Sequence, residues 1–228
     1  DLIIGTSIGS LLGACLGLGI DPTYMRHTAT KFSFNHLMDL TIPSVSFSSG
    51  KKLREFICVT LQDKTYADMR CPLHIVTTNI EDGSEITFSS GNLKQIIQAS
   101  CSLPGVFPPV IIDGKTLIDG GIINSVPVSV AIKLKATTII AVDVGFCVRK
   151  EQMTNLLQII IQSVQIMGKK LNKYEASSAD VIIQPDLKDI DQLAFNRAED
   201  VINEGYRKTK EKIKQIKRLL SMPYRILR

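Results

Sequence analysis

The motif Gly5-Thr6-Ser7-Ile8-Gly9 restricts what this chain can fold into more than any other feature. The pattern G-x-S-x-G is typical of a sharp turn between a strand and a helix, where a serine hydroxyl projects from the edge of an α/β sheet. The residues before it, Asp1 to Ile4, have the composition of a strand that is about to end. The motif therefore predicts a strand–turn–helix unit with Ser7 at its apex, exposed as a candidate nucleophile.

Beyond this motif, apolar segments of strand length alternate with segments of helical periodicity. Strands are expected at residues 72–80, 85–88, 110–112, 116–118, 138–144 and 180–183, and helices at residues 10–18, 51–61, 92–102, 127–134, 154–174 and 200–220. Asp82-Gly83 and Asp113-Gly114 favour hairpin turns, whereas residues 21–50 carry weak signals. Because the strands are uniformly apolar, we expect an α/β fold of three layers, α/β/α, around a mostly parallel sheet.

A nucleophilic serine needs a base, and histidine is the usual one. The three histidines of the chain are poor candidates. His74 lies within an apolar strand, where a buried core histidine is the plainer interpretation. His27 and His36 fall in the weakly patterned segment, without flanking glycines or a strand end to position them. The sequence therefore does not predict a Ser-His-Asp triad.

A carboxylate is the alternative base, and Asp119 is the candidate. It follows the strand expected at residues 116–118, and strand ends in α/β folds deliver side chains to the active crevice. The glycines behind it, Gly120 and Gly121, allow a sharp turn and close approach to another element. An ordinary Asp-Gly turn, as expected at Asp82-Gly83, remains the plainer interpretation from composition alone.

The five cysteines give no sign of a disulfide framework or a zinc site. Their number is odd, they are widely spaced, and no C-x-x-C pair occurs: Cys15, Cys58, Cys71, Cys101 and Cys147. This usage favours a reducing compartment, with the thiols acting as small buried apolar groups. We expect no metal and no cofactor.

Three blocks in this order resemble the patatin-like phospholipase family, in particular its short bacterial members. The blocks are Gly5-Thr6-Ser7-Ile8-Gly9, Ala99-Ser100-Cys101-Ser102-Leu103-Pro104-Gly105-Val106-Phe107-Pro108-Pro109-Val110 and Asp119-Gly120-Gly121. Asn124-Ser125-Val126-Pro127 is also similar to the N-x-[LV]-P segment of the family. The similarity runs from Asp1 to about Gly145 and continues weakly to Tyr206.

This resemblance implies a Ser-Asp dyad that works without histidine. Carried over to this chain, Ser7 is the nucleophile and Asp119 the general base, with Gly5, Gly9, Gly120 and Gly121 shaping the two turns. The expected reaction is hydrolysis of acyl esters of phospholipids or lysophospholipids through an acyl-serine. A catalytically inactive lipid-binding or scaffolding protein on the same fold is the main alternative, and acyl transfer is a third.

The resemblance also implies oxyanion donors from a glycine-rich loop, G-G-G-x-[RK]-G, ahead of the segment that matches Asp1 to Ile4. The sequence contains no Gly-Gly-Gly, so this loop and the family's first strand are expected to be missing. The backbone N–H of Ile8 is expected to be one donor. A protein limited to these residues is expected to be inactive, and a piece of a longer chain is favoured over a degenerate relative.

The net charge of +5 is concentrated at the C-terminus. From Arg207 to Arg228 there are nine basic residues and one acidic residue, a net of +8, which leaves −3 for the remainder. We therefore expect a hydrolase domain over residues 1–206 and a basic helix or tail over residues 207–228. The stripe of apolar residues in the same region comprises Ile202, Tyr206, Ile213, Ile216 and Leu220.

Such a helix suits an anionic membrane surface, which we expect to contact Lys208 to Arg228. The alternative is that the stripe packs on the sheet while the lysines are solvated. No apolar run reaches the roughly 18 residues of a spanning helix. The expected location is therefore cytoplasmic, peripheral at the inner face of the membrane. Nucleic acid is not expected as a partner, because no interleaved aromatic pattern accompanies the basic residues. The sequence leaves the oligomeric state undetermined.

Overall fold

A computed structural model describes residues 1–31, 33, 36–39, 46–145, 158–160, 162–164, 166–168, 176–187, 190 and 194–221. The helices are α1 (Ile8–Gly17), α2 (Pro22–Lys31), α3 (Lys51–Leu61), α4 (Leu93–Ser100), α5 (Val128–Lys133) and α7 (Ala198–Leu220). The strands are β1 (Ile3–Thr6), β2 (Leu73–Asn79), β3 (Glu85–Phe88), β4 (Val110–Ile112), β5 (Lys115–Asp119), β6 (Ile140–Val142) and β7 (Val181–Ile183). The helix expected at residues 154–174 lies largely outside the described residues, and its described positions between 158 and 168 are helical.

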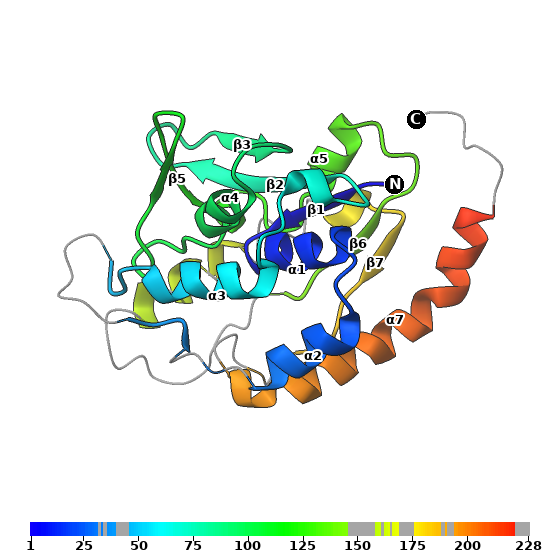
Figure 1. Ribbon diagram of the computed structural model, residues 1–228. Coiled ribbons are helices and arrows are strands. Elements are labelled where there is room, and N and C mark those ends of the chain that lie inside the picture. Colours follow the sequence, from blue (N-terminus) through cyan, green and yellow to red (C-terminus); the bar gives the residue numbers. More distant parts are fainter. Residues whose placement is uncertain are drawn as a thin grey trace.

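The fold is the expected α/β class, with a central sheet flanked by helices (Figure 1). The sheet is mixed, however, and the expectation of a mostly parallel sheet is wrong. β2 runs parallel to β1 but antiparallel to β3 and β5, and β4 is antiparallel to β5. β6 and β7 form a separate parallel pair. Two antiparallel pairs, β2–β3 and β4–β5, arise at the Asp-Gly turns, whereas β2 and β5 pair across a long connection. At Asp113-Gly114 both φ angles are positive, 50° and 74°, as a two-residue hairpin loop requires.

Two strands meet end to end along one edge of β2. β3 pairs with β2 over Ile75–Thr78 and so occupies the opposite edge. On the remaining edge, β1 runs parallel to β2 and ends with Thr6 opposite Val76. β5 runs antiparallel to β2 and ends with Asp119 opposite Thr77. Because both strands stop at adjacent positions of β2, the residues at their carboxyl ends are brought together.

Three helices cover this sheet and bury the main core. α1, α3 and α4 pack on one another, and α1 and α4 also pack on β2 (Figure 1). The fully buried side chains of this core include Leu11, Cys15, Ile57, Leu61, Leu73, Ile75, Ile96 and Ile97. A smaller cluster of Val126, Val128 and Ala141 lies between the start of α5 and β6. The main core therefore lies on the side of the sheet from which α1 leaves β1.

α2 is a helix that the sequence did not predict. It begins at Pro22, and the Asp21 carboxylate accepts a hydrogen bond of 2.7 Å from the Thr23 N–H. None of its residues is buried, so it lacks the apolar stripe that marks a helix in a sequence. It lies beside α7, to which Arg26 is joined through Glu199 and through Asn203 at 2.9 Å (Figure 1).

α7 is continuous across the boundary expected between residues 206 and 207, and it packs on β7 as well as on α2. The expected apolar stripe lies at the margin of its packed face. Ile202 and Ile216 are half-buried, whereas Tyr206, Ile213 and Leu220 are exposed. Among the described residues, no helix combines the length and apolarity needed to cross a bilayer.

Candidate active site

Ser7 lies at the turn between β1 and α1, as the motif predicts. Its φ and ψ angles are 53° and −130°, a conformation that is unfavourable for a residue with a side chain. Gly5 is required here, because a Cβ at that position would lie 2.4 Å from the Gly9 carbonyl oxygen. Gly9 itself has open space around the position of a Cβ. The turn is closed by the Ser10 N–H and hydroxyl, which donate to the Ser7 carbonyl at 2.8 and 2.6 Å.

Asp119 lies opposite this turn, and its carboxylate contacts Ser7 directly. The Ser7 hydroxyl donates to Asp119 Oδ2 at 2.6 Å, a length typical of a hydrogen bond to a charged oxygen. The other carboxylate oxygen, Oδ1, accepts the Gly121 N–H at 2.7 Å. The two residues are 112 positions apart in sequence, and the meeting of β1 and β5 on one edge of β2 joins them.

The environment of Asp119 makes its carboxyl group more basic than that of an exposed aspartate. The residue is only 5% exposed. Burial raises the pKa of Asp119 to about 6, while the hydrogen bonds from Ser7 and Gly121 lower it. Burial therefore dominates, since it destabilises the charged form. A carboxyl with this pKa is ionised at neutral pH, yet it is more basic than an exposed aspartate.

The backbone around Asp119 is packed too closely for larger residues. A Cβ on Gly120 would lie 2.4 Å from the Val76 carbonyl oxygen, so this glycine is needed for the approach to β2. A Cβ on Gly121 would lie 3.1 Å from Asp119 Oδ1, which is a tight contact. The pair Gly120-Gly121 thus permits the turn that leads away from the carboxylate.

Two hydroxyl groups and one backbone carbonyl, to which the sequence analysis assigned no role, fix the backbone of both residues. The Ser7 N–H donates to Ser100 Oγ at 2.9 Å, and the Asp119 N–H donates to the Ser102 carbonyl at 3.0 Å. Thr78 Oγ1 donates to the Asp119 carbonyl at 3.1 Å. Ser100 and Ser102 lie in the block Ala99–Val110, which the sequence analysis used only for the family resemblance. No residue of this block has a chemical role that is evident from the sequence.

The start of α1 carries backbone donors beside the Ser7 hydroxyl. Ile8 and Gly9 open the helix, and no acceptor for their N–H groups exists in the part of the chain that the structure describes. A helix N-terminus favours negative charge, because its first N–H groups are unpaired and the macrodipole is positive there. The Ser7 N–H is not available in this way, since Ser100 accepts it.

Histidine takes no part in this arrangement. Within the described residues, the hydrogen-bond partners of Ser7 and Asp119 include no imidazole. His74 lies on β2 opposite Ile4, where burial lowers its pKa. Among the described residues no cluster of His, Cys, Asp and Glu could hold a metal ion, and Cys15, Cys58, Cys71 and Cys101 are free thiols. Cys147 lies outside the described residues.

Comparison with known proteins identifies the class to which this fold and site belong. Residues 1–132, more than half of the chain, match the family model of patatin-like phospholipases. The chain therefore belongs to the patatin-like phospholipase family.

The curated relatives include fungal and mammalian proteins. Lysophospholipase nte1 of Aspergillus fumigatus is 36% identical over 151 residues, which are 64% of this chain and 10% of that protein. Patatin-like phospholipase domain-containing protein 6 of Homo sapiens is 31% identical over 198 residues, which are 83% of this chain and 14% of that protein. The chain thus spans 10–14% of the length of these relatives.

Proposed function

We propose that this domain is a serine hydrolase that cleaves acyl esters of phospholipids or lysophospholipids with a Ser7–Asp119 dyad. The observation that carries the proposal is the 2.6 Å hydrogen bond from the Ser7 hydroxyl to Asp119 Oδ2. The strained turn at Ser7 and the raised pKa of Asp119 add support, because each has a cost to the fold that a purely structural contact would not require. The names of the relatives point to lipid esters as the substrate class.

The chemistry proceeds in two steps. As Ser7 Oγ attacks the ester carbonyl, ionised Asp119 accepts the hydroxyl proton at Oδ2. The tetrahedral adduct collapses, the alcohol part of the lipid leaves with that proton, and an acyl-serine remains. Asp119 then accepts a proton from a water molecule that attacks the acyl-serine. The fatty acid is released as the proton returns to Ser7 Oγ.

Charge on the tetrahedral oxygen requires donors that are already in place. The N–H groups of Ile8 and Gly9 are the candidates on this chain, since they open α1 next to the attacked carbon. Loss of one such donor typically costs about a hundredfold to a thousandfold in rate. The main contribution of the fold to catalysis is thus a rigid turn that presents nucleophile and helix N-terminus on the same side.

Release of fatty acid from a lysophospholipid tests this proposal. Because the expected glycine-rich loop lies outside residues 1–228, the assay uses a chain that carries this loop as well. That chain is expected to release fatty acid, and its Ser7→Ala variant is expected to lose at least about a thousandfold in kcat, as triad knockouts do. A chain that binds lipid vesicles but releases no fatty acid would instead favour the non-catalytic lipid-binding alternative. Transfer of the acyl group to an added alcohol, in place of release to water, would favour acyl transfer.

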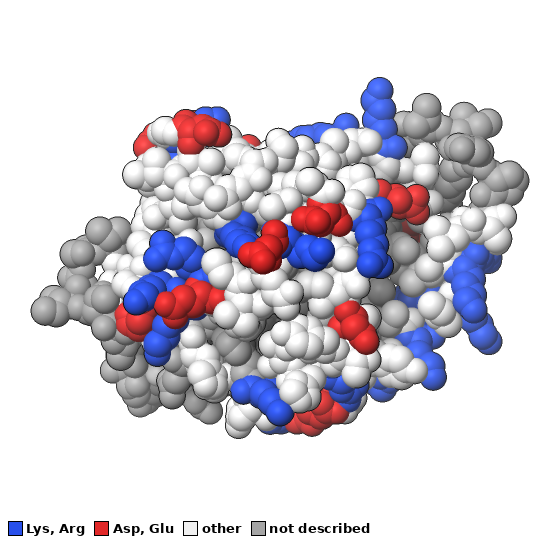
Figure 2. All heavy atoms as spheres, in the orientation of Figure 1, with Lys and Arg blue, Asp and Glu red and all other residues white. Residues whose placement is uncertain are grey.

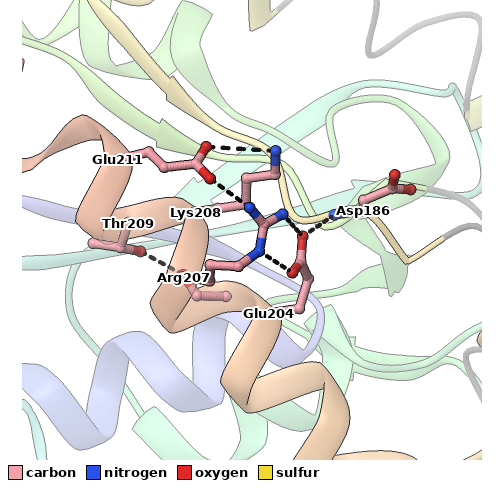
Figure 3. Close-up of polar contacts among 7 residues, drawn as sticks. Asp186, Glu204, Arg207, Lys208, Thr209 and Glu211 are labelled. Carbon is pink, nitrogen blue, oxygen red and sulfur yellow. Dashed lines mark hydrogen bonds and ion pairs between the residues drawn. The ribbon is translucent and has the colours of Figure 1, made fainter.

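We also propose that α7 contacts an anionic membrane surface at the cytoplasmic face. Figure 2 shows Lys and Arg side chains along the lower right edge of the molecule, where α7 runs. In its middle, Arg207 donates to both carboxylate oxygens of Glu204, at 2.7 and 2.8 Å, and Lys208 pairs with Glu211 at 3.5 Å (Figure 3). These cations are largely neutralised, so the net charge comes from the helix beyond Glu211.

The exposed face of α7 carries apolar side chains next to these basic residues. Tyr206, Ile213 and Leu220 are 63%, 41% and 62% exposed and recur every seven residues. Lys210 and Lys217 lie between them, and the Lys210 ammonium lies 5.1 Å from the Tyr206 ring centre. Apolar side chains beside exposed lysines are typical of helices that lie in a membrane interface. The opposite face of α7 packs on α2 and β7, which supports peripheral contact by one side of the helix.

A further inference from the structure

The backbone N–H of the nucleophile is held by a buried side chain from another element. Ser7 donates this N–H to Ser100 Oγ at 2.9 Å. Ser100 is the last residue of α4 and is completely buried. Its own hydroxyl hydrogen is donated to the Val76 carbonyl on β2 at 2.7 Å. A single side chain therefore links the turn at Ser7 to the central strand.

The position of this link matters, because Val76 lies where β1 and β5 meet. Val76 is opposite Thr6, the residue before the nucleophile, and its neighbour Thr77 is opposite Asp119. The same segment after α4 also holds the base, since the Ser102 carbonyl accepts the Asp119 N–H at 3.0 Å. The end of α4 thus contacts the backbone of both members of the dyad.

The turn at Ser7 needs such a restraint. Its φ of 53° is unfavourable for a serine, and positions of this kind persist only where surrounding contacts over-determine them. β1 supplies pairing only as far as Thr6, and the helical bonds of α1 begin with the Ser10 N–H. Between these points Ser100 is the acceptor that fixes the direction of the Ser7 peptide group.

We infer that Ser100 is a positioning residue of this hydrolase, whose hydroxyl holds the Ser7 turn against β2 so that Ser7 Oγ stays within hydrogen-bond distance of Asp119. The inference rests on the proposed function of the dyad. Ser100 does not touch the reacting atoms, so its loss should slow the chemical step without weakening substrate binding. Misplacement by about 1 Å typically costs about a hundredfold. We expect kcat to fall about 10- to 100-fold in Ser100→Ala, with KM unchanged.

The matched control is Thr77→Val. Thr77 is also completely buried, and its hydroxyl likewise donates to a backbone carbonyl, that of Ile86 at 3.0 Å. The Thr77 backbone pairs with Asp119, but its hydroxyl points to β3 on the other edge of β2 and makes no bond to Ser7 or Asp119, so Thr77→Val tests whether loss of a buried hydroxyl near the dyad is enough to lower kcat. Both variants lose one buried hydroxyl and its bond to a backbone carbonyl, and Ser100→Ala also loses the acceptor of the Ser7 N–H, so the free energy of unfolding is measured beside kcat. Only Ser100→Ala should lose kcat.

Further substitutions of Ser100 keep the inference testable if Ser100→Ala does not fold. Ser100→Cys keeps nearly the same volume, but its sulfur is a weak acceptor, so the Ser7 N–H is held poorly. Ser100→Thr keeps the hydroxyl and should restore kcat to within about threefold if the extra methyl is accommodated. The pH profile provides a further measurement, because a weaker Ser7–Asp119 hydrogen bond shifts the acid limb to higher pH.

The test measures kcat, KM, the acid limb and the free energy of unfolding for the wild type, Ser100→Ala, Ser100→Cys, Thr77→Val and Ser7→Ala. The inference predicts a lowered kcat, and an acid limb of the pH profile shifted to higher pH, in Ser100→Ala and Ser100→Cys only. It is overturned if their kcat lies within twofold of Thr77→Val while Ser7→Ala is inactive. If Ser7→Ala is as active as the wild type, the dyad itself is wrong, and that outcome is distinct.

Discussion

At the scale of single residues, the site depends on a carboxyl group that the fold keeps away from water. Asp119 accepts two hydrogen bonds, and yet its pKa is about 6 because it is 5% exposed. An exposed aspartate would be a weaker base toward a serine hydroxyl. Removing the base from solvent thus increases its basicity while leaving it ionised at neutral pH.

The first prediction concerns pH and activity. Because Asp119 must be ionised to accept the Ser7 proton, kcat/KM for a neutral p-nitrophenyl ester should rise with pH, with an apparent pKa of about 6, and then level off. The measurement is initial rate between pH 4.5 and 8 at low substrate concentration. An acid limb near pH 4, or none at all, would contradict the assignment of Asp119 as the base.

The second prediction separates the two glycines of the G-x-S-x-G motif. A methyl group on Gly5 would clash with the Gly9 carbonyl, so Gly5→Ala should destabilise the fold by about 1–3 kcal/mol or more. Gly9 lies in the first turn of α1 with open space around it, so Gly9→Ala should stabilise by up to about 1 kcal/mol. Urea denaturation checks both variants. Equal losses would mean that the turn differs from the geometry described.

At the scale of secondary-structure elements, the sequence predicted most strands and helices but not how they join. α3 and β3 have the bounds that periodicity predicts, and Asn92 caps α4 by accepting the Gln95 N–H at 3.2 Å. α2 was missed because its packing partner, α7, lies far along the chain and leaves no apolar stripe. A sequence pattern shows only the periodicity of neighbouring residues. A polar helix such as α2 is stabilised by contacts with residues far along the chain, which the pattern does not show.

The contact between Ser7 and Asp119, where β1 and β5 meet, also could not be predicted from local sequence. Ser7 and Asp119 could be named from the turn motif, the strand end and the family resemblance. Their 2.6 Å contact depends on how β1 and β5 each pair with β2, and this pairing joins residues that are far apart in the chain. Ser100 and Ser102 contribute through a hydroxyl and a backbone carbonyl, and neither bond has a signature in sequence spacing.

The third prediction concerns α7. Lys214 and Lys217 lie beyond its ion pairs and are exposed. If they face an anionic bilayer, reversing both charges should weaken partition to phosphatidylserine vesicles at least roughly 30-fold, since each lost cation costs about 1 kcal/mol and the new carboxylates add repulsion. Liposome flotation measures this partition. Lys51→Glu with Lys52→Glu, on α3, makes the same change in net charge and should have little effect.

Flotation on neutral vesicles is the second arm of that experiment. Equal recovery of the wild type on neutral and anionic vesicles would contradict an electrostatic contact. An equal loss in the α3 double variant would mean that overall charge, rather than α7, determines binding. Added salt should weaken the wild-type contact, because screening shortens the range of the attraction.

At the scale of the whole molecule, the site lowers the stability of the fold at neutral pH. The pKa of Asp119 is about 6 in the folded state, above that of an unfolded aspartate. Between those two values the folded state binds more protons, so stability falls as pH rises from about 4 through 6. The ionised carboxyl therefore costs on the order of 3 kcal/mol at pH 7.

The fourth prediction follows from this fall in stability with rising pH. Asp119→Asn should be more stable than the wild type at pH 7.5, and the difference should shrink by about 2 kcal/mol at pH 4, where the folded wild-type carboxyl is neutral. Urea unfolding at the two pH values measures it. Asp82→Asn is a control of opposite sign: hydrogen bonds from Ser84 lower the pKa of Asp82, so this variant should be less stable than the wild type at pH 7.5, and the difference should shrink as the pH falls. A constant difference for Asp119→Asn would indicate that its carboxyl is not buried in the charged form.

The activation of Ser7 as a nucleophile by Asp119 is tested most directly by the rate at which a fluorophosphonate labels the protein. Intact mass and peptide mapping should show one adduct, on Ser7, in the wild-type chain. Labelling should be absent in Ser7→Ala and at least about a hundredfold slower in Asp119→Asn, which retains the fold. Labelling of Ser7→Ala at the wild-type rate, or an unchanged rate in Asp119→Asn, would contradict the account.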